Sequence, residues 1–405
     1  MKVRNTALLL LMLATGSVQG QVTSHNAQTP DGEKTLLERV AKIEKENDKF
    51  NLYLNMHGEF NAEFNQGGSE GFNKGAFNMR QLRIEAKGKV TDWLSYRWRQ
   101  RLNRGNEGGG MIDNLPNSID YAGIGVKFND QFSIFAGKQA AAYGGFEYDL
   151  NPIEIYQYSE MIDNMSNFMT GVTLDYNMTP NQQFQFQILD SRNNSQDETY
   201  GAGLEESRLP LVYSLAWNAN MFDNKWQTRW SASVMEETHG NYMYYLALGN
   251  QFNFSPKCNM FVDLMSSYEQ LDRKGIMTKM FGGQAKFGGH NMYNTLYNSL
   301  VAKVNWRFQP KWNFFVKGML ESAAIYGGGA NDGVYNGGSV ANGNYRTSVG
   351  YLTGIEYYPM ESNLHLFLTF VGQTHLFTER AKALGLNDYS TQRVSLGFIY
   401  QLPVY

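Results

Sequence analysis

The sequence has a single cysteine, Cys258, among 405 residues, so it cannot form a disulfide within the chain. A disulfide-stabilised scaffold is excluded. Because no cysteine stands directly after the N-terminal segment, we expect no lipoprotein anchor there. Past residue 20 the sequence has no run of about 18 uncharged apolar residues, which excludes a bundle of membrane helices. Nine prolines and a net charge of −3 give no case for a proline-rich disordered chain or for binding nucleic acid.

The first twenty residues have the composition of an export signal. Lys2 and Arg4 make the start basic, residues 7–14 are apolar, and residues 18–20 place small side chains at the cleavage position. We expect residues 1–20 to be a signal peptide and the protein to leave the cytoplasm. Its removal would make the mature chain two charge units more negative.

The next segment changes from a polar arm to a helical pattern. Residues 21–34 are polar and are expected to form a flexible arm, and residues 35–50 have apolar positions at helical spacing. The seam consists of Leu36, Val40, Ile43 and Asn47. Isolated helices shorter than about 12 to 15 residues are marginal in water, so this short periplasmic coiled-coil helix needs a partner. It either packs on its own domain or trimerises the chain, with Asn47 fixing the register.

From Asn51 onward the apolar residues recur at every second position, which is the pattern of β-strands. In residues 52–64, for example, apolar side chains alternate with polar ones. The pattern predicts sixteen strands near residues 51–64, 77–90, 93–103, 119–128, 132–139, 169–177, 182–190, 210–220, 226–236, 242–252, 258–267, 295–308, 312–321, 345–358, 364–373 and 391–402. The expected fold over residues 51–405 is all-β.

The connections between these strands alternate in length. Tight polar turns such as 91–92, 129–131 and 309–311 alternate with Gly- and Asn-rich segments that mostly exceed ten residues, such as 140–168 and 268–294. Short turns at one end and long loops at the other are typical of an outer-membrane barrel. The sequence therefore predicts a 16-stranded antiparallel transmembrane β-barrel, preceded by the short coiled-coil helix.

Aromatic residues flank the predicted short turns, for example Trp93, Phe128 and Trp312, as in the interfacial girdle of a membrane barrel. On this interpretation the apolar face of each strand contacts lipid and the polar face lines the lumen. The alternative is a water-soluble barrel or propeller with ordinary alternation.

Over most of its length the sequence resembles the phosphate-selective porin O and P family of Gram-negative outer membranes. The residues that support the resemblance are Phe77-Asn78-Met79-Arg80-Gln81-Leu82-Arg83, Gly88, Asp92, Tyr96-Arg97, Ile134-Phe135-Ala136-Gly137-Lys138 with Gly144, and Arg393-Val394-Ser395-Leu396-Gly397. The resemblance implies a homotrimeric porin through which small anions diffuse. After Gly137 the family tends to have Lys and then Pro-Phe-Gly, whereas this chain has Ala140 and Ala142-Tyr143-Gly144. The expected preference is therefore for small anions in general, with phosphate as one candidate among them.

Charged residues on the predicted inward face are mostly basic. The cations are Arg83, Lys87, Lys89, Arg97, Arg99, Arg101, Lys127, Arg229, Lys303, Arg307, Lys317 and Arg393, and the acids are Glu59, Glu63, Glu85, Asp175, Asp263, Glu321 and Glu356. Half of the cations, from Arg83 to Arg101, lie on the second and third strands and are the candidate pore-lining, anion-binding residues. Such a surface raises the local anion concentration in a narrow pore. Alternatively, the basic residues face an acidic loop at 140–168, as in a non-selective porin.

Motifs for catalysis are scarce. Gly67 to Gly71 match the G-x-S-x-G pattern, but they lie in a polar loop between two strands, where a strand-to-helix elbow cannot form. No histidine or cysteine spacing suggests a metal site, and we expect neither metal nor cofactor. The sequence thus predicts a non-enzymatic outer-membrane porin whose partners are small anionic or polar solutes, membrane lipid and copies of itself. The alternatives are a non-selective porin, an adhesin or structural anchor, and a barrel lipase.

Overall fold

The computed structural model describes residues 49–66, 70–104, 113–327, 334–335, 338–360 and 363–404. Residues 1–48 lie outside the described residues. They include the predicted signal peptide, the arm and most of the predicted coiled-coil helix, with Leu36, Val40, Ile43 and Asn47. No helix in the described ranges is long and apolar enough to cross a membrane.

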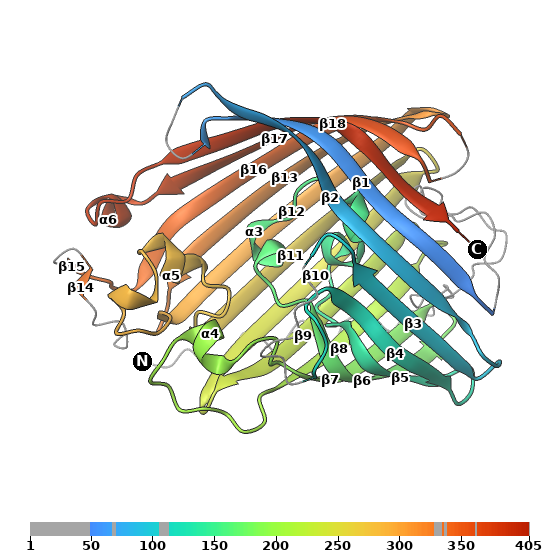
Figure 1. The fold of residues 1–405 in the computed structure, drawn as a ribbon, viewed down its shortest axis with the longest axis horizontal. Coiled ribbons are helices and arrows are strands. Elements are labelled where there is room, and N and C mark those ends of the chain that lie inside the picture. Colours follow the sequence, from blue (N-terminus) through green and yellow to red (C-terminus); the bar gives the residue numbers. More distant parts are fainter. Residues whose placement is uncertain are drawn as a thin grey trace.

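In the described part of the chain, sixteen strands form one closed antiparallel barrel (Figure 1). They are β1 (Asn51–Phe64), β2 (Phe72–Lys89), β3 (Leu94–Arg101), β4 (Ile119–Lys127), β5 (Phe132–Ala140), β6 (Phe168–Thr179), β7 (Gln182–Asp190), β8 (Leu211–Met221), β9 (Trp226–Thr238), β10 (Asn241–Ser255), β11 (Cys258–Leu271), β12 (Tyr293–Gln309), β13 (Trp312–Ile325), β16 (Gly343–Tyr357), β17 (His365–Phe377) and β18 (Tyr389–Pro403). Each predicted strand overlaps one of them. The predicted sixteen-stranded barrel is therefore confirmed.

Every barrel strand pairs with its neighbour in the chain, and β1 closes the barrel by pairing with β18. Two short strands, β14 (Val334–Tyr335) and β15 (Gly338–Ser339), pair with each other outside the barrel, so β13 pairs directly with β16. The short helical elements in the connections are α2 (Phe146–Asp149), η2 (Pro152–Glu154), α3 (Glu160–Asp163), α4 (Gln196–Tyr200), α5 (Ile276–Met280), η3 (Gln284–Lys286) and α6 (Glu379–Lys382).

The two ends of the barrel differ as the alternating connections predicted. In Figure 1, α4, α5 and α6 gather at one end, where the long connections lie, and the opposite end has tight turns such as the one after β12. Because short turns are periplasmic in outer-membrane barrels, we expect the end with the helical connections to be external, and we call it the external end.

The height of the wall varies around the barrel. The strands β3, β4 and β5 have 8, 9 and 9 residues, whereas β12 has 17. Eight residues at about 3.3 Å each and a tilt of about 40° span roughly 20 Å, less than the apolar band of about 25 Å. The wall is therefore low at β3–β5 and tall on the opposite side, at β11–β13.

The inner face is polar only in part, which corrects the expectation that the polar face lines the whole lumen. On β1, Asn55, His57 and Glu59 are buried on the inner side, as predicted. On other strands, inward residues such as Phe261 and Val301 are apolar and belong to one large buried cluster. The cluster also includes residues of the connection between β5 and β6. This connection folds into the barrel, so the strands that it covers have apolar side chains on both faces.

Candidate functional site

The predicted basic residues of β2 and β3 lie together on the inner wall. Arg97, Arg99 and Arg101 alternate along β3 and therefore share one face of the strand. The register pairs Arg101 with Arg83 of β2. We call these four arginines the basic wall. All four are buried or half-buried, so none extends into bulk solvent.

Asp120 of β4 joins three of these arginines. Its carboxylate lies 3.0 Å from Arg83, 3.1 Å from Arg99 and 2.8 Å from Arg101, and the residue is fully buried. Charge-assisted contacts of this kind fix the direction in which a guanidinium points. Asp120 is thus the central anchor of the basic wall.

Period-two alternation does not predict Asp120 as a lumen residue, because a β-bulge changes the direction of its side chain. The register of β3 against β4 shifts between Arg99 and Gln100, since Arg99 pairs with Tyr121 but Gln100 pairs with Ile119. The extra residue is Asp120, which alternation from Lys127 had placed on the outer face. Bulges re-aim single side chains in this way, and strict period-two counting cannot detect them.

The fourth arginine, Arg97, pairs with Glu85 of β2 at 2.9 Å. The four arginines and the two carboxylates that pair with them, Asp120 and Glu85, together have a net charge of +2, and the charge given for the basic wall below includes these two acids. Arg97 is also the most accessible of the four, with 21% of its side chain exposed. The excess positive charge is what can attract an anion to this wall.

Aromatic rings lie against the same arginines. The Arg97 guanidinium lies 3.8 Å from the ring centroid of Tyr121, and that of Arg99 lies 4.8 Å from it. Arg101 lies 5.5 Å from the centroid of Phe168. Stacking on rings holds the planar guanidinium groups without neutralising their charge.

The two lysines predicted for this site lie on β2, where Lys87 is the register partner of Arg97 and Lys89 follows two residues later. Lys87 is half-buried, and its Nζ lies 5.3 Å from the ring centroid of Tyr53, which faces the lumen. Lys89 ends β2 at the periplasmic rim and is exposed. The structure therefore brings Arg83, Arg97, Arg99 and Arg101 together as one site. Lys87 lies beside Arg97 at the edge of this site, and only Lys89 lies beyond it at the end of β2.

The connection formed by residues 141–167 crosses the lumen, and we call it the lumen loop. Two wall carboxylates hold its short helices by their backbone N–H groups: Asp263 accepts from Phe146 and Glu147, each at 2.8 Å. In the same way, Glu321 accepts from the first two residues of α3, at 2.8 and 3.0 Å. Two of the acids predicted to line the pore thus hold the loop in place.

Three acids of the lumen loop pair with cations of other strands rather than with the basic wall. Glu147 is bonded to Lys317 of β13, and Glu160 to Arg346 of β16. Asp149 lies 2.9 Å from Arg229 of β9. The arrangement in which an acidic loop faces the basic wall is therefore not seen for these three acids.

Tyr158 of the lumen loop interacts electrostatically with the basic wall. Burial raises the pKa of Tyr158 to about 12, and the positive charges of Arg83, Arg99 and Arg101 act against this rise. Tyr158 is therefore a neutral phenol at neutral pH, within electrostatic range of the basic wall. Such a group can donate a hydrogen bond to an anion without repelling it.

Further contacts tie the loop to the strands next to the basic wall. The His57 imidazole of β1 lies 2.9 Å from the Ile153 carbonyl oxygen, and Arg393 of β18 donates to the Tyr156 carbonyl at 2.8 Å. The loop thereby divides the lumen. One side packs into the apolar cluster, and the other side faces the basic wall.

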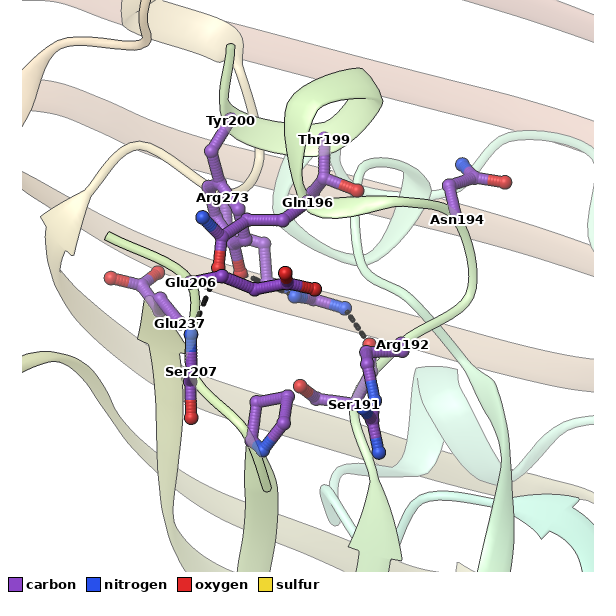
Figure 2. Close-up of a pocket in the computed structure, with 11 residues that line it drawn as sticks. Ser191, Arg192, Asn194, Gln196, Thr199, Tyr200, Glu206, Ser207, Glu237 and Arg273 are labelled. Carbon is purple, nitrogen blue, oxygen red and sulfur yellow. Dashed lines mark hydrogen bonds between the residues drawn. The ribbon is translucent and has the colours of Figure 1, made fainter. Parts of the chain in front are cut away.

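A second candidate site, at the external end, is closed by its own contacts. Figure 2 shows Arg273 reaching from the β11–β12 connection to the loop before β8, where it donates to the Ser191 carbonyl at 2.7 Å. Arg273 also bonds to the hydroxyl of Tyr200. The cavity between these loops, about 10 Å³, holds roughly one water. This pocket therefore joins two external loops and leaves no room for a solute.

A serine and a histidine do meet inside the barrel. Ser348 Oγ lies 2.7 Å from Nδ1 of His375, and both residues are buried. The nearest carboxylate, Glu160, lies 3.4 Å from the serine oxygen and is already paired with Arg346. An activated serine needs its acid on the other nitrogen of the histidine. This pair therefore does not have the geometry of a catalytic triad.

Comparison with known proteins agrees with this picture. The family model of the phosphate-selective porins O and P matches residues 50–402. No curated protein matches the chain.

Three solved structures are similar to it over most of their length. The outer membrane channel DcaP of Acinetobacter baumannii has a TM-score of 0.59 at 12% identity, covering 87% of this chain and 97% of that one. An anion-selective porin from Comamonas acidovorans has 0.57 at 9%, covering 87% and 99%. A trimer form of the outer membrane protein OmpT of Vibrio cholerae has 0.52 at 10%, covering 88% and 100%. Because the sequence identities are this low, the structural similarity shows a shared fold and nothing more.

Proposed function

The chain belongs to the phosphate-selective porin O and P family, and from this premise we propose that it is an outer-membrane diffusion porin with a preference for small anions. The observation that supports the preference is the net charge of +2 on the basic wall. Fixed cations beside a low-dielectric wall lower the barrier for anions and raise it for cations.

The geometry of the basic wall suits oxyanions as well as chloride. Guanidinium groups stay charged at any physiological pH and present a planar fork of donors to carboxylate or phosphate oxygens. Asp120 and Glu85 use part of these donors, so we propose transient contacts with a passing anion rather than tight binding. Anions then pass along the row from Arg101 to Arg97.

We also propose a homotrimer. The low wall at β3–β5 does not reach across the apolar band, so covering it with a second subunit would remove the mismatch. One structurally similar barrel is described as a trimer form, and the sequence pattern of residues 35–50 is typical of a trimerising helix. The inter-subunit face would then include the outer side of β3–β5.

A non-selective porin is the second candidate, because Asp120 and Glu85 neutralise half of the basic wall. One experiment separates the two. Purified protein in a planar bilayer under a potassium chloride gradient should conduct, with a reversal potential of the sign set by chloride. A reversal potential near zero would favour the non-selective porin, and a silent bilayer would contradict both.

A further inference from the structure

The outer wall carries a row of small polar side chains where a lipid-facing barrel is expected to be apolar. The row consists of Ser266, Asn298, Ser322 and Thr347, which are register partners on the adjacent strands β11, β12, β13 and β16. They lie on the same face as exposed leucines such as Leu264 and Leu300, and so they point away from the lumen. We call them the polar row.

The polar row forms the floor of a groove. The next register row toward the periplasm is apolar, with Leu264, Leu300 and Leu320 on β11, β12 and β13 and Val349 on β16. Toward the external end, Tyr268 follows Ser266 on the outer face and stacks on Tyr244. Between these larger side chains lies a hollow of about 470 Å³, lined by the leucines and the polar row.

The polar row presents hydrogen-bond donors that the barrel does not use. Ser266 donates to Asn298 Oδ1 at 2.9 Å, and Asn298 donates one amide hydrogen to Ser322 at 3.4 Å. In the described part of the chain, the second amide hydrogen of Asn298 and the hydroxyl hydrogen of Ser322 have no acceptor. An unmet donor is costly in hydrocarbon, so this depth of the wall calls for an acceptor from outside the chain.

The position of the groove indicates which molecule supplies that acceptor. The groove lies one row inside the external tyrosines, at the depth where the acyl chains of a lipid join its polar part. It also lies on the tall side of the barrel, opposite the low wall at β3–β5 that needs a second subunit. We propose that the groove binds an outer-leaflet lipid whose acyl chain carries a hydroxyl group near the headgroup, and that the oxygen of this hydroxyl accepts from Asn298 and Ser322.

The test uses two probes that differ by one oxygen: phosphatidylethanolamine with a β-hydroxymyristoyl chain and the same lipid with a myristoyl chain. Native mass spectrometry of the delipidated intact protein measures the ratio of the two bound forms. We expect the hydroxylated lipid to bind about three to ten times more tightly, as one or two hydrogen bonds in an apolar setting provide.

The double variant Asn298→Leu with Ser322→Ala should bring this ratio to about one. The matched control is Thr374→Ala with Ser390→Ala, which removes an outward-facing hydroxyl pair 2.9 Å apart on β17 and β18 and should leave the ratio unchanged. If Asn298→Leu prevents assembly, Ser322→Ala alone should still lower the ratio.

Three results would overturn the proposal: equal binding of the two lipids to the unaltered protein, an unchanged ratio in the double variant, or dissociation of a trimer in that variant. The last result would assign the groove to a second copy of the chain. Bilayer conductance, measured in parallel, is expected to stay unchanged, so that a failure here is distinguishable from a failure of the porin function.

Discussion

At the scale of single residues, Asp120 decides how the basic wall is built. Three arginines converge on its carboxylate, and no other acid of the described residues contacts more than one of them. Arginines placed this close repel one another, so the shared acid both offsets the repulsion and sets their spacing. The excess charge that remains is a property of the whole group and cannot be assigned to one arginine.

Replacing Asp120 with Asn should therefore have two effects. The wall gains one net positive charge, so the reversal potential should move further toward anion selectivity. Removing one partner of a buried ion cluster should also lower the free energy of unfolding of the barrel by about 3 kcal/mol, which urea unfolding would measure. The matched control is Asp175→Asn on β6, since the partner of Asp175 is the neutral Gln185 at 2.8 Å. Equal urea midpoints for the two variants would argue against the anchoring role.

At the scale of structural elements, the lumen loop determines which part of the inner wall a solute can reach. Three of its acids are paired with Lys317, Arg229 and Arg346, which lie on β13, β9 and β16 and not on β2 or β3. These pairs hold the loop against the apolar cluster. The basic wall is left on the other side of the loop.

Lys317→Met should loosen the lumen loop. Lys317 and Glu147 are almost fully buried, so the change leaves the Glu147 carboxylate with Ser159 as its remaining partner. The uncompensated buried charge should displace the loop and raise both the single-channel conductance and the frequency of transient closures. Single-channel recording measures both quantities.

The control for this variant is Lys127→Met. It removes an ion pair with Asp130 that is exposed at a periplasmic turn, and exposed pairs contribute little. Its channels should match those of the unaltered protein. Unchanged recordings for Lys317→Met would contradict the role of this pair in holding the loop.

The sequence predicted the elements well, because period-two alternation and turn length are local properties. It predicted less well which way individual side chains point. Asp120 was missed since one bulge reverses the alternation. Alternation from Asp263 and Lys303 does place Phe261 and Val301 inward, but apolar inward side chains were not expected, because they pack on a loop distant in sequence. Register shifts and long-range packing leave no local signature in a single sequence.

At the scale of the whole molecule, the uneven height of the wall orients the barrel among its neighbours. The strands β3–β5 are too short to span the apolar band, whereas β10–β13 have 14 to 17 residues and can face lipid over their full height. The low side is therefore the expected contact between subunits.

A lysine at the low wall should separate the subunits. Ile124 of β4 points outward and is 51% exposed, so Ile124→Lys would place a charge in the expected contact. Light scattering in mild detergent should then report monomers. Leu264→Lys, at an equally exposed position of the tall wall, should leave the trimer intact. A trimeric Ile124→Lys protein would contradict the assignment of this face.

The sidedness of the barrel can be tested on whole cells. A tag inserted at Gly203, in the open loop before β8, should be reached by antibody, because long loops are external. A tag between Pro310 and Lys311 should be reached only after the outer membrane is opened. The reverse labelling would show that the barrel has the opposite orientation in the membrane.

The measurement that tests the central claim most directly is the reversal potential of two paired variants. Arg83→Gln with Arg101→Gln takes the basic wall from +2 to zero, yet leaves Arg99 with Asp120 and Arg97 with Glu85. Arg97→Gln with Glu85→Gln also removes two charged groups but keeps the net charge at +2. In a potassium chloride gradient, the first variant should lose most of the anion selectivity and the second should retain it. Equal reversal potentials for both variants and the unaltered protein would contradict the claim that the basic wall sets the selectivity.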